Sequence, residues 1–471
     1  MVMRHLQSNV HRGRLSSQIN NGARSFSSRE EIVEGVWIFH RHGDRTPGRP
    51  LVADSYIEEE AAFWRTKIPP LDRTHYEMLR EKFSAIIHEN HNGQFLDADG
   101  AGKEPYGFLT WKGMEQMYDT GNLISQSYHI QSKGNGSFTD YWDITAFSTN
   151  YLRTVKSCQC FLDGLLSTPK SVATDAKHIN MTHYENVNPE DYLKSSSNPD
   201  IAINVRDIKH ETLNAFNTSP ELMKRLVEDI IDTPEFIDKD SKAASLAARL
   251  SNFIPGLVNF TSYGGPSGIN WIHASDHFIC RSSHDVTFTK FSHLEHDNEA
   301  EQTLRAMSYS TLSHLALRFR SWYQNPTLLA AMGGPPLKEV NEQMDRIINA
   351  GAGDSYRKPF TVFSCHDVTI LALLYGIGAD FLACSKDLQA IGMDANNDTF
   401  RLRYWPHYAS TLTIELVRVK TKGEEEEFLV KTLLNGKPVR TMAALRKNKE
   451  SMNASDFNEL MDRMSVVLHQ Y

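Results

Sequence analysis

Cysteine is scarce in this sequence, and the few cysteines form no recognisable framework. The 471 residues contain five, an odd number, and their spacings lack the dense pattern of a disulfide-stabilised secreted domain. They are Cys158, Cys160, Cys280, Cys365 and Cys384. Cys158 and Cys160 have no second pair that would complete a zinc site. We therefore expect reduced, mostly buried thiols.

An excess of positive charge is also missing. The formal net charge is −8 at pH 7 and no basic stripe stands out, whereas nucleic-acid-binding surfaces are usually basic. Long apolar runs are missing too. The longest candidate, near Ile370–Ile377, has the length of a buried core helix rather than of a bilayer span. These absences predict a globular protein with no nucleic acid partner and no transmembrane segment.

Acidic residues are absent from residues 1–29, and Glu30 is the first. This stretch has five arginines and many serines and asparagines, but no apolar run of the kind that a secretory signal peptide needs. The composition predicts a transit peptide and a mitochondrial location, with a disordered cationic arm as the alternative. Six Asn-x-Ser/Thr sequons keep the secretory route open, and a cytoplasmic location is a further alternative.

Three strand-like segments are each followed by a helical pattern or a charged loop, which is typical of an α/β fold. Val33–Phe39 is almost continuously apolar, as expected for a strand buried on both faces. Ile144–Ser148 and Phe360–Cys365 are the other two. Thr411–Val417 alternates apolar and polar residues, and Phe428–Leu433 follows a glycine turn and precedes Asn-Gly, so we predict two late strands with hairpin turns.

The region between the second and third of these strands is mainly helical. Ser219-Pro220 and Thr233-Pro234 each have the form of an N-cap followed by proline at the first helical position. Ala243–Phe253 and Glu301–Trp322 continue the helical pattern. This predicts a helical cap inserted into, or alongside, an α/β core. The units we predict are an arm at 1–29, the first part of the core at 30–168, the mainly helical cap at 169–300 and the second part of the core at 301–471.

Charged residues follow each of the first three strands. In open α/β sheets the ligand site lies beyond the carboxyl ends of the strands, so these residues are expected to converge. They are Arg41, His42, Arg45, Arg153, His366 and Asp367.

Such a pocket would be strongly positive. Buried guanidinium groups are costly without an anionic partner, and their forks match phosphate oxygens. Transfer of a phosphoryl group needs this kind of electrostatic stabilisation. A neutral histidine is a competent nucleophile for the transfer. Asp367 is the acid that could protonate the leaving alkoxide, which requires its protonated form and favours mildly acidic conditions.

These residues resemble the motifs of a known family. The segment 41–47, Arg-His-Gly-Asp-Arg-Thr-Pro, matches the R-H-G-x-R-x-P signature of histidine acid phosphatases. Further stretches agree in order, and the matches run from roughly residue 32 to 440. They are Leu109-Thr110-x-x-Gly113-x-x-Gln116, Ser148-Thr149-x-x-x-Arg153-Thr154, His366-Asp367-x-Thr369, and Tyr408-Ala409-Ser410 with Glu415-Leu416.

The resemblance implies both a fold and a mechanism. The implied fold is a doubly wound, mostly parallel mixed sheet with helices on both faces and an inserted helical cap. The implied substrate is a small phosphomonoester, and no metal or other cofactor is implied. The implied roles are His42 as the nucleophile that becomes phosphohistidine, Arg41, Arg45, Arg153 and His366 as the phosphate-binding residues, and Asp367 as the proton donor.

The sequence resembles one branch of the family more than the others. The form His-Asp-Val-Thr at 366–369, the lack of a disulfide pattern and the transit-like N-terminus resemble the mitochondrial lysophosphatidic acid phosphatase branch. Secreted members usually have several disulfides, which this chain lacks. Cys365 lies where many members have glycine, and residues 170–350 show little similarity to family motifs.

Metal-dependent chemistry is an alternative interpretation. His40-x-His42-x-Asp44 has the spacing of a metal-binding cluster, and His366-Asp367 resembles the pair in H-D metallohydrolases. Metal-bound water would then attack the phosphate. Against this, Arg41 and Arg45 lie between or beside the supposed ligands, where guanidinium groups would repel a cation.

Two further alternatives keep the pocket and change the function. Phosphoglycerate-mutase-like relatives share Arg-His-Gly and transfer phosphate between hydroxyls, but their proton donor is typically a glutamate elsewhere. An inactive phosphate-binding scaffold would be expected to lack the nucleophile or the acid, and this sequence has both His42 and Asp367.

Overall fold

The computed structural model describes most of the chain. The described residues are 29–69, 75–87, 104–129, 137–167, 184, 201–259, 265–350, 357–379, 405–439, 441, 444, 447, 449 and 451–469. The predicted arm before residue 29 and Cys384 lie outside them. The other four cysteines are buried and free, in agreement with the prediction. No helix in the described ranges is long and apolar enough to cross a membrane.

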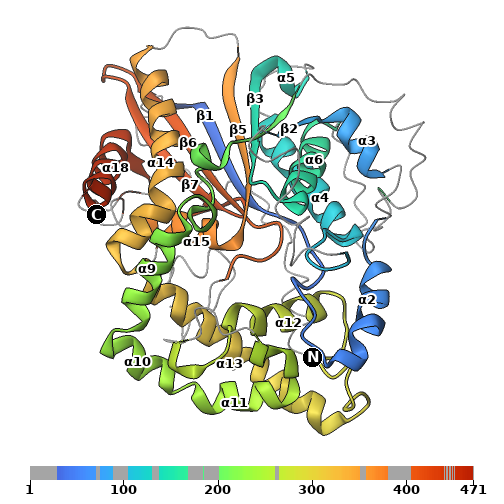
Figure 1. The fold of residues 1–471 in the computed structure, drawn as a ribbon. Helices are drawn as coiled ribbons and strands as arrows, with labels where there is room; N and C mark the ends of the chain where they lie inside the picture. Colours follow the sequence, from blue (N-terminus) through green and yellow to red (C-terminus); the bar gives the residue numbers. More distant parts are fainter. Residues whose placement is uncertain are drawn as a thin grey trace, which may run out of the picture.

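A nine-stranded mixed sheet forms the centre of the molecule (Figure 1). The strand order is β2-β4-β3-β5-β1-β6-β7-β8, with β9 paired to β7. The parallel half consists of β2 (Ala85–Ile87), β4 (Ile203–Val205), β3 (Trp142–Ser148), β5 (Lys358–Cys365) and β1 (Arg29–Arg41). The antiparallel half consists of β6 (Thr411–Thr421), β7 (Glu427–Leu434), β8 (Lys437–Pro438) and β9 (Met452–Asn453). The three strands predicted to end at the site, β3, β5 and β1, are therefore neighbours.

The apolar character of β1 reflects burial on both of its faces. Trp37 and Phe39 pack in one core, where the Phe39 ring stacks on Phe363 of β5 with centroids 4.5 Å apart. Val36 and Ile38 point to the opposite core. Because side chains alternate along a strand, only a continuously apolar segment can fill both cores.

Helices cover both faces of the sheet (Figure 1). One face carries α14 (Pro326–Asn349), α15 (Asp367–Gly376) and α18 (Ala454–His469). The other carries α3 (His75–Lys82), α4 (Trp111–His129), α5 (Phe138–Tyr141) and α6 (Leu152–Leu166). The predicted doubly wound α/β architecture is thus confirmed.

A third group of helices forms a layer at one end of the sheet, the lower part of Figure 1. It consists of α9 (Pro220–Ile231), α10 (Pro234–Ser241), α11 (Ala244–Phe253), α12 (Trp271–Ser283) and α13 (Asn298–Tyr323). Shorter helices are η1 (Asp54–Tyr56), α2 (Ile57–Arg65), η5 (Ile208–His210), α8 (Ala215–Thr218), η6 (Pro255–Asn259) and η7 (Gly265–Ser267). We call α9–α13 the cap. Both α9 and α10 begin at the predicted prolines, and Thr233 caps α10 by accepting from Phe236 N.

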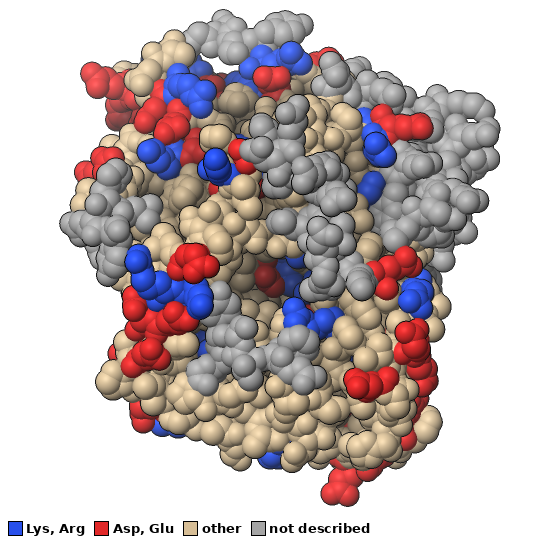
Figure 2. Space-filling view, viewed as in Figure 1, with Lys and Arg blue, Asp and Glu red and all other residues tan. Residues whose placement is uncertain are grey.

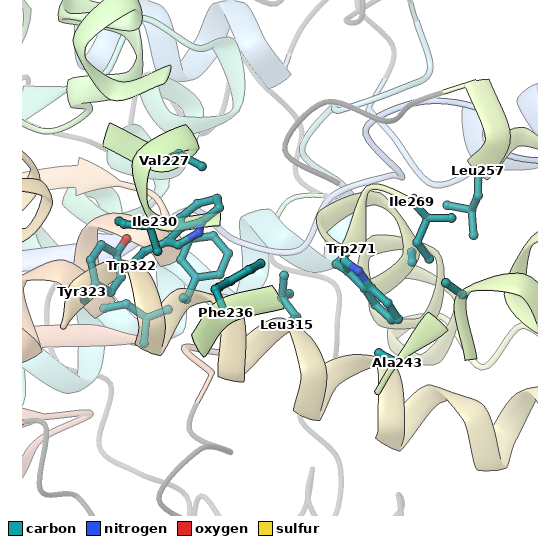
Figure 3. Packing of buried hydrophobic residues seen from close by; sticks show 14 of the residues in the cluster. Val227, Ile230, Phe236, Ala243, Leu257, Ile269, Trp271, Leu315, Trp322 and Tyr323 are labelled. Atoms are coloured by element: carbon teal, nitrogen blue, oxygen red, sulfur yellow. The ribbon is translucent and has the colours of Figure 1, made fainter. Parts of the chain in front are cut away.

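The cap has an aromatic core that continues into the body of the protein. Figure 3 shows Trp322 and Tyr323 packed beside Ile230. The same cluster of buried residues includes Leu371 and Ala372 of α15. The cap and the helix that begins at Asp367 therefore share apolar packing. The exact division of the chain at 168, 169, 300 and 301 stays a prediction.

A buried ion pair joins α2 to α12. Arg281 Nη2 lies 2.6 Å from Glu60 Oε1, and each side chain is 1% exposed. Tyr106 donates to Glu60 Oε2, and Arg281 Nη1 lies 2.9 Å from His277 Nδ1. Glu60→Ala leaves a guanidinium buried without its counter-ion. We expect the free energy of unfolding, measured with urea, to fall by about 3–5 kcal/mol.

An exposed ion pair of the cap is the control for this prediction. Glu235 and Lys239 lie four residues apart on α10 in contact with solvent, and exposed pairs add little to stability. Glu235→Ala should therefore leave the unfolding curve almost unchanged. If both variants unfold like the wild type, the Glu60–Arg281 pair is not a structural link.

Candidate active site

The carboxyl ends of β1, β5 and β3 bring the predicted site residues together. His42 N donates to Cys365 O at 3.1 Å, which joins the ends of β1 and β5. Thr149 N donates to Ser364 O at 3.2 Å, which joins the ends of β3 and β5. Residues that are more than 100 positions apart in the sequence therefore meet at one edge of the sheet. Figure 2 shows a hollow between the sheet body and the cap in which basic and acidic side chains lie close together.

His42 is the centre of this arrangement. Its side chain is buried, and Nδ1 lies 2.8 Å from Gly43 O. When Nδ1 carries the ring proton it donates to this carbonyl, and Nε2 keeps its lone pair. Burial, together with the positive charges of Arg153, Arg41 and Arg45, holds the pKa of His42 well below its usual range. The lowered pKa favours the neutral imidazole, in which Nε2 carries no proton.

The loop after His42 is held against α4 by close backbone contact. A Cβ atom at Gly43 would lie 2.2 Å from Gly113 O, so no larger residue fits there. Gly43 N donates to Ser157 Oγ at 3.0 Å, and Asp44 N donates to Gln116 Oε1 at 2.8 Å. The glycine and glutamine of the 109–116 motif thus hold the loop after His42 in place.

Asp367 is paired with Arg41, the residue that precedes His42. Asp367 Oδ2 accepts from Arg41 Nη2 at 2.9 Å and from Trp405 Nε1 at 3.2 Å, and Oδ1 accepts from Val368 N at 2.9 Å. The carboxyl is 20% exposed and so can reach a substrate. His366 is the N-cap of α15, and Asp367 is the first residue of the helix.

His366 and Arg153 form the side of the site nearest β3. His366 Nε2 lies 3.1 Å from Thr149 Oγ1, and its ring meets the Tyr151 ring edge-on. Burial and the nearby charges of Arg153 and Arg41 lower the pKa of His366 well below its usual range. Arg153, in the first turn of α6, lies over the Tyr151 ring at 4.4 Å. A cation at a helix N-terminus is unfavourable alone and favours a bound anion nearby.

Arg45 extends from the same loop to the cap. Its Nη1 and Nη2 atoms donate to Asp276 Oδ2 and Oδ1 at 3.1 and 2.7 Å, and Nη1 also donates to Thr46 O at 2.8 Å. Asp276, which lies on α12, also accepts from Gly48 N at 2.8 Å. No local sequence motif marks Asp276, so its contact with Arg45 could not be predicted from the sequence.

Two aromatic residues from the segment before β6 complete the site. Arg41 lies over the Tyr408 ring at 4.3 Å, and the Tyr408 and His42 rings are 5.8 Å apart. Trp405 contacts Asp367, as described above. The Tyr-Ala-Ser motif indicates that residue 408 belongs to this region, but nothing in the sequence indicates that its ring faces the nucleophile.

Two arginines of the site have a buried donor without a partner. Nε of Arg41 and Nε of Arg45 are buried, and neither has a hydrogen-bond acceptor in the described part of the chain. A buried N–H without an acceptor is destabilising. Arg41 precedes His42 in the sequence, and Arg45 follows it three residues later. Phosphate oxygens would be suitable acceptors, because N–H groups of arginine bind phosphate strongly.

The donor set of the metal alternative does not converge. The His40 ring stacks on Phe161 in the core, and burial lowers its pKa to about 4. Asp44 Oδ1 accepts from Thr110 Oγ1 and His284 Nε2, both at 2.6 Å. Neither side chain joins His42, and over the ranges described no three His, Cys, Asp or Glu residues are grouped to hold a metal ion. This arrangement does not fit a cluster of His40, His42 and Asp44.

The family model of the histidine phosphatase superfamily, branch 2, matches residues 32–435. The chain belongs to this superfamily, which confirms the resemblance of its motifs to histidine acid phosphatases.

Among individual proteins, the chain is similar to lysophosphatidic acid phosphatase type 6 of Mus musculus, with 26% identity over 156 residues. The Bos taurus protein of the same name is 26% identical over 138 residues. These matches cover 32% and 29% of this chain and about a third of each relative, 36% and 31%. A solved structure of Bifidobacterium longum multiple inositol polyphosphate phosphatase with inositol hexasulfate shares the fold, with a TM-score of 0.50, 12% identity and 96% coverage of both chains.

Proposed function

We propose that this protein hydrolyses phosphomonoesters through a phosphohistidine intermediate on His42. The observation that carries the proposal is a buried, neutral imidazole flanked by two guanidinium groups whose Nε donors have no partner in the described ranges. A phosphoryl group would supply acceptors to both. Membership of the superfamily supports the same reaction.

The proposed reaction has two displacements. His42 Nε2 attacks phosphorus, the bond from phosphorus to the ester oxygen breaks, and that oxygen takes a proton from Asp367. Water then attacks the phosphohistidine and gives a proton to Asp367, the N–P bond breaks, and the imidazole returns neutral. The oxygens of the transferred group are held in both steps. The residues that hold them are Arg41, Arg45, Arg153 and His366.

Among phosphomonoesters, we propose a substrate with an apolar alcohol part, such as lysophosphatidic acid. The names of the matched mouse and bovine relatives favour it. The surroundings of Asp367 also favour it, because partly buried Trp405 packs against Phe319 of the cap with ring centroids 5.2 Å apart. Apolar surface therefore lies next to the group that protonates the leaving oxygen.

A panel of substrates tests this function. Full-length protein is incubated with an aryl phosphate, lysophosphatidic acid, a sugar phosphate and an inositol phosphate, and free phosphate is measured with and without EDTA. We expect release of free phosphate in both conditions, most efficiently from lysophosphatidic acid. Activity that is lost in EDTA and restored by a divalent ion would contradict the proposed mechanism. A phosphorylated isomer as product would indicate a transferase, and no turnover would indicate a scaffold.

The site should work at acid pH. An imidazole is neutral above its pKa, so the lowered pKa of His42 keeps the nucleophile neutral at lower pH. We expect kcat/KM for an aryl phosphate, whose leaving group needs no proton from Asp367, to stay level from about pH 7.5 to about pH 5 once it is corrected for the second ionisation of the substrate near pH 6. Because kcat/KM reports groups of the free enzyme, an inflection near pH 6.5 would mean that His42 titrates as an ordinary histidine.

The mitochondrial location rests on the composition of residues 1–29. Fusion of this segment to a fluorescent protein tests it. We expect mitochondrial targeting and cleavage near the end of the segment, whereas uniform fluorescence in the cell would support the arm alternative.

A further inference from the structure

One face of helix α12, in the cap, contacts residues 44–48, the part of the loop after His42 that carries the proposed phosphate ligand Arg45. Asp276, Cys280 and Ser283 lie at helical spacing on this face, and His284 follows directly. Asp276 binds Arg45, while Ser283 and His284 donate to Asp44. The cap thus contacts two consecutive residues of the loop, Asp44 and Arg45. Residues 44–48 cannot move independently of this helix.

The contact with Asp276 determines which N–H groups of Arg45 remain for a ligand. A guanidinium has five N–H bonds. Three are directed to Asp276 Oδ1, Asp276 Oδ2 and Thr46 O. The two others are Nε–H and the second Nη2–H, which are parallel along one edge of the planar group. Such an edge is a bidentate donor for two phosphate oxygens.

We propose that Asp276 is a positioning residue for Arg45, holding its guanidinium so that the Nε–Nη2 edge meets the substrate phosphate. This inference rests on the proposed function, because it takes Arg45 as a phosphate ligand. The role is indirect, since the carboxylate of Asp276 contacts the arginine and the backbone at Gly48. Without the Asp276 carboxylate, the side chain of Arg45 would have several orientations. Phosphate binding would then have to fix one of them, at a cost in conformational entropy.

The charge state of Asp276 is consistent with this role. Burial opposes its ionisation, but the Arg45 charge and the hydrogen bond from Gly48 N leave its pKa below the usual value. The ion pair is largely withdrawn from water, with side chains 15% and 11% exposed. A carboxylate in that setting holds a guanidinium firmly, because competing water is excluded.

Asp240 offers a matched control within the cap. It is also a buried aspartate that binds an arginine and a backbone N–H, through Arg318 and Ser267 N. His314 donates to it as well. Asp240 lies on α10 and its partners lie on α13 and η7, and none of these residues belongs to the site. Asp240→Asn should therefore disturb the cap without changing phosphate affinity.

The test measures inhibition by inorganic phosphate during aryl phosphate hydrolysis by the full-length protein. We expect Asp276→Asn to raise the inhibition constant of phosphate about tenfold or more, as for the loss of one strong coupled contact. Asp240→Asn should leave it unchanged. Arg45→Ala should also raise it, and Asp276→Asn should add nothing in the Arg45→Ala background, because a residue that acts only through another has no effect once that residue is gone.

Either of two results would overturn the inference. One is an inhibition constant for Asp276→Asn equal to that of the wild type. The other is an effect that adds in full to that of Arg45→Ala, which would indicate a separate structural role. If Asp276→Asn does not fold, Asp276→Ser applies the same test without placing an amide against the guanidinium. Failure of Arg45→Ala itself to weaken phosphate binding would instead contradict the proposed function.

Discussion

Replacement of His42 by alanine should abolish turnover on every substrate, with a loss on the order of 10³-fold or more. The imidazole is the proposed bond-forming group, and no other described side chain combines burial between the arginines with a lone pair held free by a backbone contact at 2.8 Å. The direct measurement is rapid-quench labelling with radioactive substrate. We expect acid-labile phosphorus on wild-type protein during turnover and none on His42→Ala.

The nearby histidine at position 40 is the control. His40 is fully buried, and its ring stacks on Phe161 in the core. Its Nε2 has no hydrogen-bond partner among the described residues. His40→Phe keeps a ring in that place, and we expect it to retain activity and phosphoenzyme formation. Turnover by wild-type protein without any labelled histidine would refute the covalent mechanism.

Asp367→Asn should slow the reaction according to the leaving group. An alkoxide needs a proton when its bond to phosphorus breaks, whereas an aryl oxide leaves without one. General acid catalysis typically contributes 10²–10⁴-fold, so we expect about that loss for alkyl phosphates and a much smaller loss for aryl phosphates. Asparagine keeps one oxygen that can accept from Arg41 and Trp405, while its NH2 group takes the place of the oxygen that accepts from Val368 N. The comparison of two substrate classes within the same variant separates the loss of the acid from this local change.

The first chemical step must be measured by itself in this test, because Asp367 is also proposed to accept the proton of water in the second. Single-turnover measurements of phosphoenzyme formation give the rate of this first step for each substrate. A plot of these rates against the pKa of the leaving alcohol should be steeper for Asp367→Asn than for wild type. Equal slopes would remove Asp367 from the role of acid.

The sequence predicts well those parts of the site that follow a strand. Because β1, β3 and β5 are apolar and parallel, the residues after each of them were expected at one edge, and there the structure places Arg41, Arg153 and His366. The sheet geometry requires this for any chain in which these strands are neighbours.

Contacts between distant segments could not be predicted in this way. Arg45 and Asp276 are 231 residues apart, and neither hydropathy nor capping signals indicate which residue of the cap meets the loop. Glu60 and Arg281 pose the same difficulty, since charged residues are expected at the surface and these two are buried.

Two elements could not be predicted from local sequence patterns. Helix α14 contains Pro335 and Pro336 in its interior, where proline normally ends a helix. Pro336 is buried, and the residues that follow it on α14, Leu337 and Val340, belong to the apolar core between this helix and the sheet. Strand β4 has three residues, too few for an alternation pattern to be recognised, although it lies between β2 and β3.

The shared packing of the cap with α15 limits how this scaffold can diversify. Leu371 and Ala372 lie in the apolar cluster of the cap, and Tyr323 of α13 donates to Val368 O at 2.8 Å, one residue after Asp367. If Asp367 is the catalytic acid, as proposed, exchange of the cap for that of another protein would also change the packing around this acid. New substrate specificity should then arise more readily from point substitutions along the rim of the hollow than from exchange of the whole cap.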